Sequence, residues 1–236
     1  MAKTKSTEVR KVIVATPALT GQVSAWYLDS LVQSVKLCAN NGIEIFPITL
    51  INESILHMAR NELVTLAYES DVESMVFIDS DQGWNPQALL KVINSADKDV
   101  LGVAVVDKTD EHGRFNVRVT ADNCSAFEKS DNSLIRVSTV GTGFLKLSKK
   151  AINALCESSQ SVTFRGKTLK KVFDFGSIDL GESLEDFIGE DINLCRKLES
   201  LEFNIWVDTE FTCSHVGSKV WHGDYGSFLR EKLAGS

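Results

Sequence analysis

The first half of the chain alternates between short apolar runs and amphipathic stretches. Apolar runs of strand length occupy residues 11–16, 43–50, 74–78 and 99–106. Stretches with helical periodicity separate them at residues 23–40, 53–69 and 85–96. Runs that are apolar at nearly every position are typical of strands buried on both faces. The alternation therefore predicts an α/β fold with a mostly parallel sheet and helices on both faces, and Pro47 indicates an edge position or a bulge in the second strand.

The pattern changes to an antiparallel character after Asp107. Residues 117–120 and 134–138 alternate like antiparallel strands, and residues 161–173 have the pattern of a hairpin. The other expected features are a close-approach turn at 141–143, an apolar run at 144–147, a helix at 148–157, a long loop at 175–188, a helix from 189 and a late strand at 204–208. We expect a single domain over residues 1–236, with an α/β half at 11–106 and an antiparallel half with a C-terminal tail at 107–236.

The third apolar run ends abruptly in two carboxylates, Asp79 and Asp81. A buried strand carries the residues that follow it to the carboxyl edge of the sheet, where open α/β sheets bind ligands. The turn begun by Ser80 and Gly83 lets both carboxylates converge on one cation. Mg²⁺ or Mn²⁺ is the natural partner because hard cations prefer oxygen ligands. The alternative is a polar turn with two solvated acids.

Charge is distributed unevenly along the sequence. The formal net charge of −7 argues against a general nucleic-acid coat, because nonspecific DNA affinity depends on neutralising phosphates. Residues 146–171 nevertheless carry seven Lys or Arg side chains against the single acid Glu157, and residues 174–202 are predominantly acidic. The basic stretch is a candidate face for a polyanionic partner, and a solvated helix and hairpin is the alternative.

The five cysteines are scattered and include no Cys-x-x-Cys pair, so we expect reduced thiols rather than disulfides or a zinc site. The sequence has no uncharged apolar run long enough for a membrane span, and its first residues lead into no signal-peptide core. These features favour a cytoplasmic protein without a membrane partner. No Gly-x-Gly-x-x-Gly or phosphate-loop motif follows the first strand, which weakens a dinucleotide-binding or ATPase interpretation.

Several short motifs occur in a definite order: Ala59-Arg60-Asn61, Phe77-Ile78-Asp79-Ser80-Asp81 with Trp84, Gly141-Thr142-Gly143-Phe144, Gly189-Glu190-Asp191 and Ser214-His215-Val216-Gly217. With this set the chain resembles, from Val12 to Asp224, nucleotide-sugar glycosyltransferases of the A-type (GT-A) fold. It is most similar to small stand-alone enzymes of tailed bacteriophages, some of which glycosylate hydroxymethylated bases of phage DNA. The resemblance implies a Rossmann-type sheet, with a nucleotide-sugar-binding half at 11–106 and an acceptor-side half at 107–236. It also implies a hexosyl- or pentosyltransferase that uses a nucleotide diphosphate sugar, with a UDP-sugar favoured.

The resemblance also implies a metal site with the Asp-x-Asp motif. Asp81 would bind the metal directly, and Asp79 would contact the ribose or the metal. His215 would be a further metal ligand, and neutral imidazole suits Mn²⁺ better than Mg²⁺. The metal would neutralise the diphosphate as it leaves. The alternative for His215 is a hydrogen-bonded structural histidine.

Glu190 and Asp191 are the catalytic candidates. Acids at the start of a helix complement the helix dipole, and this capping role is the alternative for both. By the resemblance, Asp191 would be the general base that deprotonates the acceptor hydroxyl for in-line attack with inversion. A carboxylate at a helix N-terminus has a low pKa, which makes it a modest base unless desolvation raises that pKa. If the enzyme retains configuration, Asp191 would orient the acceptor instead.

The donor site implied by the resemblance draws on both halves of the chain. Its residues would be Thr16, Pro17, Arg60, Asp79, Trp84, Gly143, Lys219 and His222. Thr16 and Pro17 would lie beside the nucleotide base, while Trp84 and Gly143 would border the sugar. The fork of Arg60 suits phosphate or base oxygens, although an exposed helix-forming arginine is the alternative. Lys219 and His222 would close over the diphosphate, and a solvated tail is the alternative for them.

The favoured acceptor is a hydroxymethylated pyrimidine in DNA, with residues 146–171 facing the phosphates. The base would have to leave the stack to reach the site. A glycan, lipid-linked or protein acceptor is an alternative. A nucleotidyltransferase is another, but residues 16–21 lack the basic residue that a triphosphate loop needs. A noncatalytic module that binds a sugar nucleotide or DNA is the alternative outside the enzymes.

Overall fold

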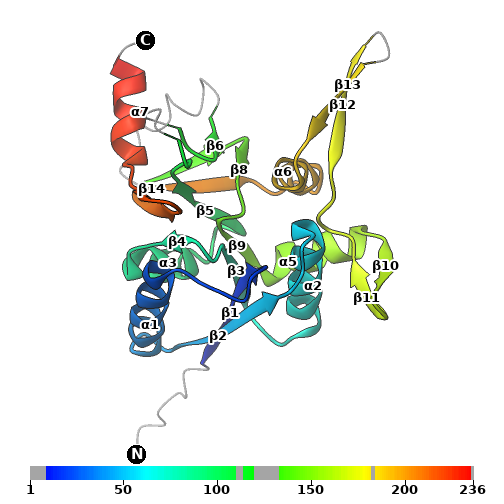
Figure 1. The fold of residues 1–236 in the computed structure, drawn as a ribbon, viewed down its shortest axis with the longest axis horizontal. Helices are drawn as coiled ribbons and strands as arrows, with labels where there is room; N and C mark the ends of the chain where they lie inside the picture. Colours follow the sequence, from blue (N-terminus) through cyan, green and yellow to red (C-terminus); the bar gives the residue numbers. More distant parts are fainter. Residues whose placement is uncertain (1–8, 110–113, 120–132, 182–183, 235–236) are drawn as a thin grey trace, which may run out of the picture.

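The computed structural model describes residues 9–109, 114–119, 133–181 and 184–234. They form an α/β fold around one large mixed sheet with helices on both faces (Figure 1). The strands of this sheet are β1 (Arg10–Ala18), β2 (Ile43–Ile51), β3 (Ser74–Ile78), β4 (Gln82–Gly83), β5 (Val100–Val105), β7 (Leu134–Val137), β9 (Phe144–Ser148), β14 (Ile205–Val216) and β15 (Val220–Trp221). The main path runs in the order β15-β14-β5-β9-β3-β1-β2.

Strands β1, β2, β3, β5 and β14 run in the same direction, as the alternating pattern predicts. β2, which contains Pro47, ends the main path of the sheet. The helices are α1 (Ala25–Ala39), α2 (Leu56–Glu69), α3 (Pro86–Asn94), α5 (Lys149–Ser158), α6 (Glu190–Ser200) and α7 (Tyr225–Ala234). Within the described part of the chain, none of these helices has the length and apolar character needed to cross a membrane.

Alternate residues of β1 face two separate apolar cores. Val12 and Val14 pack in a cluster with buried residues of α1 and α3. Ile13 and Ala15 pack in the other cluster with buried residues of α2, α5 and α6. Side chains of successive strand residues point to opposite faces, so a strand covered on both faces must be apolar throughout. This explains the unbroken apolar run that the sequence shows.

One strand from the second half of the chain lies at the centre of the sheet. β9 runs antiparallel to β3, where Phe77 is opposite Leu145, and antiparallel to β5, where Gly102 is opposite the same leucine. The sequence marks the apolar run but not its position between two strands of the first half. The two halves therefore share one sheet, and the turn before β9 meets the end of β3 directly.

Three small antiparallel ladders lie outside this sheet: β6 (Val117–Arg118) with β8 (Thr139–Val140), β10 (Ser161–Phe164) with β11 (Lys167–Lys170), and β12 (Gly176–Gly181) with β13 (Leu184–Ile188). The predicted hairpin is confirmed as β10 and β11, with Arg165 and Gly166 at positive φ in its two-residue turn. The prediction of a long loop at 175–188 is wrong. β12 and β13 pair there as a ribbon that projects from the body of the molecule (Figure 1).

A buried amide fastens α2 to the second half of the chain. The Asn61 side chain accepts a hydrogen bond from the N–H of Phe173 at 2.7 Å and donates one to the carbonyl oxygen of the same residue at 2.8 Å. Asn61 is fully buried, so water has no access to replace these bonds. The asparagine of the Ala59-Arg60-Asn61 motif thus fixes the helix that carries Arg60.

We expect Asn61→Ala to lower the free energy of unfolding by about 3 kcal/mol, because it leaves a buried N–H and a buried carbonyl without partners. Urea unfolding followed by circular dichroism measures this change. Asn41→Ala is the matched control, since Asn41 is exposed and its amide bonds only the Leu37 carbonyl oxygen. If Asn61→Ala lowered the free energy of unfolding no more than Asn41→Ala, the stabilising role of the Asn61–Phe173 hydrogen bonds would be contradicted.

Candidate functional site

The end of β3 and the turn before β9 meet at the carboxyl edge of the sheet. The N–H of Asp79 donates to the carbonyl oxygen of Gly143 at 3.1 Å, and the N–H of Gln82 donates to the carbonyl oxygen of Asp79 at 3.1 Å. A Cβ on Gly143 would lie 3.4 Å from Asp79 Oδ2 and 3.3 Å from Val105 Cγ2. The predicted close-approach turn is therefore present, and the small size of Gly143 leaves the Asp79 carboxylate its space.

Arg60 joins this edge to the start of α6. Its guanidinium donates to Glu190 Oε1 at 2.7 Å and to Asp79 Oδ1 at 3.3 Å. The Arg60 side chain is only 4% exposed, so the interpretation as an exposed helix former is wrong. Two carboxylates from distant parts of the sequence, Asp79 and Glu190, thus meet at the buried guanidinium of Arg60. Glu190 acts here as a partner of Arg60, with its carboxylate turned to the guanidinium.

Asp81 has a different set of neighbours. Its Oδ2 accepts a hydrogen bond from Lys108 Nζ at 2.5 Å and lies 3.4 Å from His215 Nε2. Burial raises the pKa of the Asp81 carboxyl, but Lys108 and the protonated form of His215, the form that can donate from Nε2, outweigh it and bring the pKa to about 2. Asp81 is therefore ionised at any physiological pH and faces two nitrogen groups.

The imidazole of His215 is oriented by the backbone. Its Nδ1 lies 2.9 Å from the carbonyl oxygen of Val106, which can only accept, so Nδ1 carries the proton. In the neutral ring the lone pair is then on Nε2, which faces Asp81. The register of β14 fixes this placement, because His215 pairs with Gln82 and the N–H of Val216 donates to the carbonyl oxygen of Asp81 at 2.8 Å.

Two of the three predicted metal ligands face each other. Asp81 supplies a carboxylate oxygen, and the neutral form of His215 supplies a nitrogen with a lone pair, a donor pair that suits Mn²⁺. Asp79 instead places its carboxylate against Arg60. Among the residues that the structure describes, no group of three or more His, Cys, Asp or Glu side chains is arranged to hold a metal. A cation at Asp81 and His215 would take its remaining ligands from the donor and water, and Asp79 as a ligand stays a prediction.

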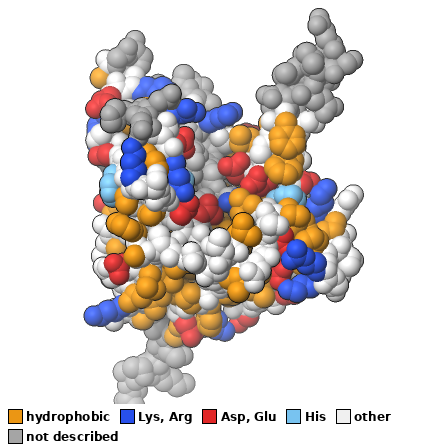
Figure 2. All heavy atoms as spheres, in the orientation of Figure 1, with side chains coloured by type: hydrophobic (Ala, Val, Ile, Leu, Met, Phe, Trp, Pro, Cys, Tyr) orange, Lys and Arg blue, Asp and Glu red, His pale blue; other side chains and the backbone are white. Residues whose placement is uncertain are grey.

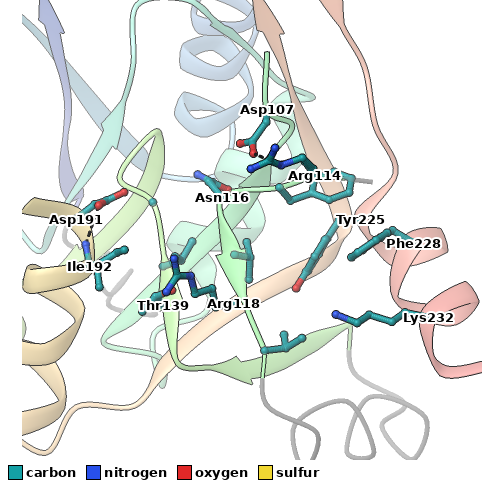
Figure 3. Close-up of a pocket in the computed structure, with 15 residues that line it drawn as sticks. Asp107, Arg114, Asn116, Arg118, Thr139, Asp191, Ile192, Tyr225, Phe228 and Lys232 are labelled. Carbon is teal, nitrogen blue, oxygen red and sulfur yellow. Dashed lines mark hydrogen bonds and ion pairs between the residues drawn. The ribbon is translucent and has the colours of Figure 1, made fainter. Parts of the chain in front are cut away.

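Asp191 lines an open cavity of about 560 Å³ (Figure 3). It lies in the first turn of α6, where its Oδ1 accepts the N–H of Ile192 at 2.7 Å. The other walls come from the segment around β6 and β8 and from α7. The lining includes three aromatic and three basic side chains: Phe115, Tyr225, Phe228, Arg114, Arg118 and Lys232. Asp191 follows Glu190, so Arg60 ties this wall of the cavity to the Asp79 edge.

The expected nucleotide-base contacts are buried in the fold. Thr16 is fully buried, and its Oγ1 lies 2.5 Å from the Tyr27 hydroxyl. Pro17 is also buried, because β1 continues to Ala18 beside β2. Their contacts with a nucleotide base stay predictions. The Thr16 hydroxyl is already hydrogen-bonded to the Tyr27 hydroxyl inside the protein.

Trp84 has a packing role in this structure. Its indole is 6% exposed and donates from Nε1 to Ser34 Oγ at 3.0 Å. The exposed indole beside the Asp79–Gly83 turn belongs to Trp26, whose Cβ would lie 3.0 Å from a Cβ on Gly83. The place of Trp84 beside a sugar stays a prediction that no contact supports. Sequence reasoning missed Trp26 because an indole at the start of a helix has no distinguishing pattern.

The C-terminal tail reaches the same edge. Gly217, at the end of the His215 motif, donates its N–H to the carbonyl oxygen of Lys219 at 2.8 Å. The Lys219 ammonium lies 5.3 Å from the ring centroid of Trp221, and His222 is exposed. No described contact joins Lys219 or His222 to the two carboxylates of the turn, and their closure over a diphosphate stays a prediction.

The cations of the basic stretch at 146–171 already have partners within the protein. Lys146 is 2% exposed and donates to the Ser95 carbonyl oxygen, and burial lowers its pKa to about 8. Lys149 donates to three carbonyl oxygens at and beyond the end of α2. The other contacts are Lys150 with Asp99, Arg165 with Glu53, Lys167 with Glu62, Lys170 with the ring of Tyr68, and Lys171 with Asp174. Lys146 and Lys149 thus have structural roles, whereas the exposed cations form surface pairs, and a phosphate-facing side made by them stays a prediction. Figure 2 shows basic and acidic side chains intermixed on the face it presents.

Four described cysteines, Cys38, Cys156, Cys195 and Cys213, are free and buried, as expected. Burial raises the pKa of each thiol, to about 11 for Cys38 and about 12 for Cys156. Cys124 and His112 lie outside the described residues. His57 packs edge-on against Phe175.

No protein-family model matches the sequence, and no curated protein matches it. Among solved structures, A197 from STIV aligns with a TM-score of 0.54 at 16% identity, covering 89% of this chain and 86% of that chain. The inositol-1-phosphate CTP transferase from T. maritima aligns at 0.48 and 13% identity over 96% and 94% of the two chains. A glycosyltransferase involved in glycosylation of the major capsid of PBCV-1 aligns at 0.33 and 17% identity over 60% and 61%. The likeness to A197 shows a shared fold, and the activity must be argued from the chemistry of the site.

Proposed function

We propose that the protein is a glycosyltransferase that moves a sugar from a nucleotide diphosphate sugar to an acceptor hydroxyl, with a divalent cation at Asp81 and His215. The observation that carries this proposal is the bridge through Arg60. It ties the strand-end carboxylates to Glu190, and so to Asp191 on the wall of the cavity. A donor bound at the strand-end carboxylates and an acceptor bound in the cavity would meet across this bridge.

The residues divide the work of an in-line displacement. A bound divalent cation would supply positive charge for the departing diphosphate. Asp79, held by Arg60, is a fixed acceptor for a ribose hydroxyl of the donor. Asp191 would accept the proton of the attacking hydroxyl, while the new bond to the sugar forms and the bond to the diphosphate breaks. Configuration at the sugar would then invert.

The acceptor we propose is a hydroxymethylated pyrimidine in DNA. The aromatic rings of Phe115, Tyr225 and Phe228 suit a flat base that has left the stack. Arg114 and Arg118 on the same cavity provide positive charge for the flanking phosphates. The cations of this cavity thus replace those of residues 146–171 in the proposal.

The test of this function is a donor panel. The protein is incubated with Mn²⁺ and each common nucleotide sugar, with and without DNA that contains 5-hydroxymethylcytosine or 5-hydroxymethyluracil. We expect nucleotide diphosphate release that the modified DNA stimulates, together with a matching gain in mass on the base. Release that is indifferent to DNA would discard this acceptor, and no release from any donor would favour a noncatalytic binding module.

We expect Asp191→Asn to lower the rate of sugar transfer by about 10²- to 10⁴-fold, since it removes the proton acceptor. Mn²⁺-dependent hydrolysis of the donor by water should fall much less, because Asp191 does not contact Asp81. Glu199→Gln is the control, an exposed acid at the far end of the same helix. Equal losses of transfer and hydrolysis in Asp191→Asn would contradict the assigned role.

Glu190→Gln should reduce transfer by about tenfold or less, because the amide oxygen can still accept from Arg60 and only the charge is lost. The side chain holds Arg60 in place and does not meet the reacting atoms in this proposal. Steady-state kinetics of Glu190→Gln and Asp191→Asn, measured side by side, compare the two. A larger loss in Glu190→Gln would exchange the roles of these neighbours.

A further inference from the structure

The ammonium of Lys108 occupies the carboxylate oxygen that a divalent cation would need. Lys108 Nζ lies 2.5 Å from Asp81 Oδ2, the same atom that is 3.4 Å from His215 Nε2. An ammonium and a divalent cation at one carboxylate oxygen would repel each other strongly at such distances. Entry of a cation between Asp81 and His215 therefore requires Lys108 to move away.

The backbone that precedes Lys108 is held, while the Lys108 side chain reaches across the tail. Val106 forms a bridge with Phe115, and the N–H of Asp107 donates to the carbonyl oxygen of Arg114 at 3.0 Å. A Cβ on Gly217 would lie 3.5 Å from Lys108 Cδ, so the lysine stem passes over the backbone that follows His215. The Lys108 side chain is 35% exposed, and its four-carbon stem can turn to another position.

The nearby acids already have partners, so a donor diphosphate is the alternative anion that the Lys108 ammonium could pair with. Asp79 is already paired with Arg60, and Asp107 lies 3.8 Å from Arg114. A donor bound at Asp81 would bring a diphosphate to the edge that Lys108 already reaches. That diphosphate gains negative charge as the sugar leaves, and an ammonium nearby would stabilise it.

We propose that Lys108 is the resident counter-ion of Asp81 in the donor-free protein and moves to the donor diphosphate when a divalent cation takes its place. This inference rests on the proposed function. It assigns Lys108 two roles of opposite sign: it opposes cation binding before the donor arrives, and it assists departure of the diphosphate afterwards. Donor and cation then favour each other's binding, because the diphosphate provides a new partner for the displaced ammonium.

Lys108→Met tests both roles, since methionine keeps an unbranched stem and removes the charge. Without donor, isothermal titration with Mn²⁺ should show binding about five- to tenfold tighter than in the unmodified protein, the gain from removing a partly exposed competing ion pair. With donor and saturating Mn²⁺, nucleotide diphosphate release should slow by about tenfold or more. A purely structural role for Lys108 would not tighten metal binding while slowing turnover.

Two further variants complete the experiment. Lys36→Met makes the same change in net charge at an exposed position of α1 and should leave both measurements unchanged. Lys108→Arg keeps the positive charge and should keep Mn²⁺ affinity near that of the unmodified protein. Unchanged or weaker Mn²⁺ binding by Lys108→Met, or no Mn²⁺ binding by any of these proteins, would overturn the proposed competition.

The proposed function and this inference fail in different measurements. If the unmodified protein releases no nucleotide diphosphate from any donor, the function is wrong, while the donor-free titration still reports on Lys108 and Asp81. If release occurs and Lys108→Met turns over at the normal rate, the assistance to the leaving diphosphate is wrong and the function stands.

Discussion

The buried guanidinium of Arg60 is the interaction on which the candidate site depends. A charge that is only 4% exposed requires compensation, and Glu190 and Asp79 provide it from two different elements. Removing one partner of a buried pair typically costs about 3–5 kcal/mol, so the protein has a strong reason to keep α2, the end of β3 and the start of α6 in one arrangement. Asn61 supports this arrangement from the next position of α2. The end of β3 and the cavity wall that carries Asp191 are therefore joined through this buried charge.

The same interaction makes the two carboxylates of the turn chemically different. Asp79 is committed to a guanidinium that is fixed by burial, whereas Asp81 faces a lysine on a mobile stem and an imidazole. Two acids in one short turn would repel each other if both lacked partners. Because Arg60 neutralises the first, the second is the carboxylate that, in the proposal, exchanges Lys108 for a divalent cation.

The sequence was sufficient to predict much of this fold, because burial on both faces leaves an unmistakable apolar run. The position of Asp79 and Asp81 at a carboxyl edge followed from the strand alone. The place of β9 could not be predicted, since the pairing partner of a strand is decided by contacts across the sheet that leave no local pattern. Trp84 and Trp26 show the same limit, because one indole is buried against Ser34 and the other is exposed beside Gly83.

Charge was the least predictable property, because sequence clustering does not determine spatial clustering. The lysines of α5 and the hairpin cap the end of α2 or pair with acids from distant segments. Arg114 and Arg118, by contrast, occur in a stretch with no basic run and yet line one cavity with three aromatic rings. Arg114 also lies 3.8 Å from Asp107, so what distinguishes these two arginines is their place in an aromatic cavity and not the lack of an acidic partner. On an acidic protein, a polyanionic acceptor would therefore depend on a small local cluster, and its affinity would follow the charge of this cavity rather than the net charge of the chain.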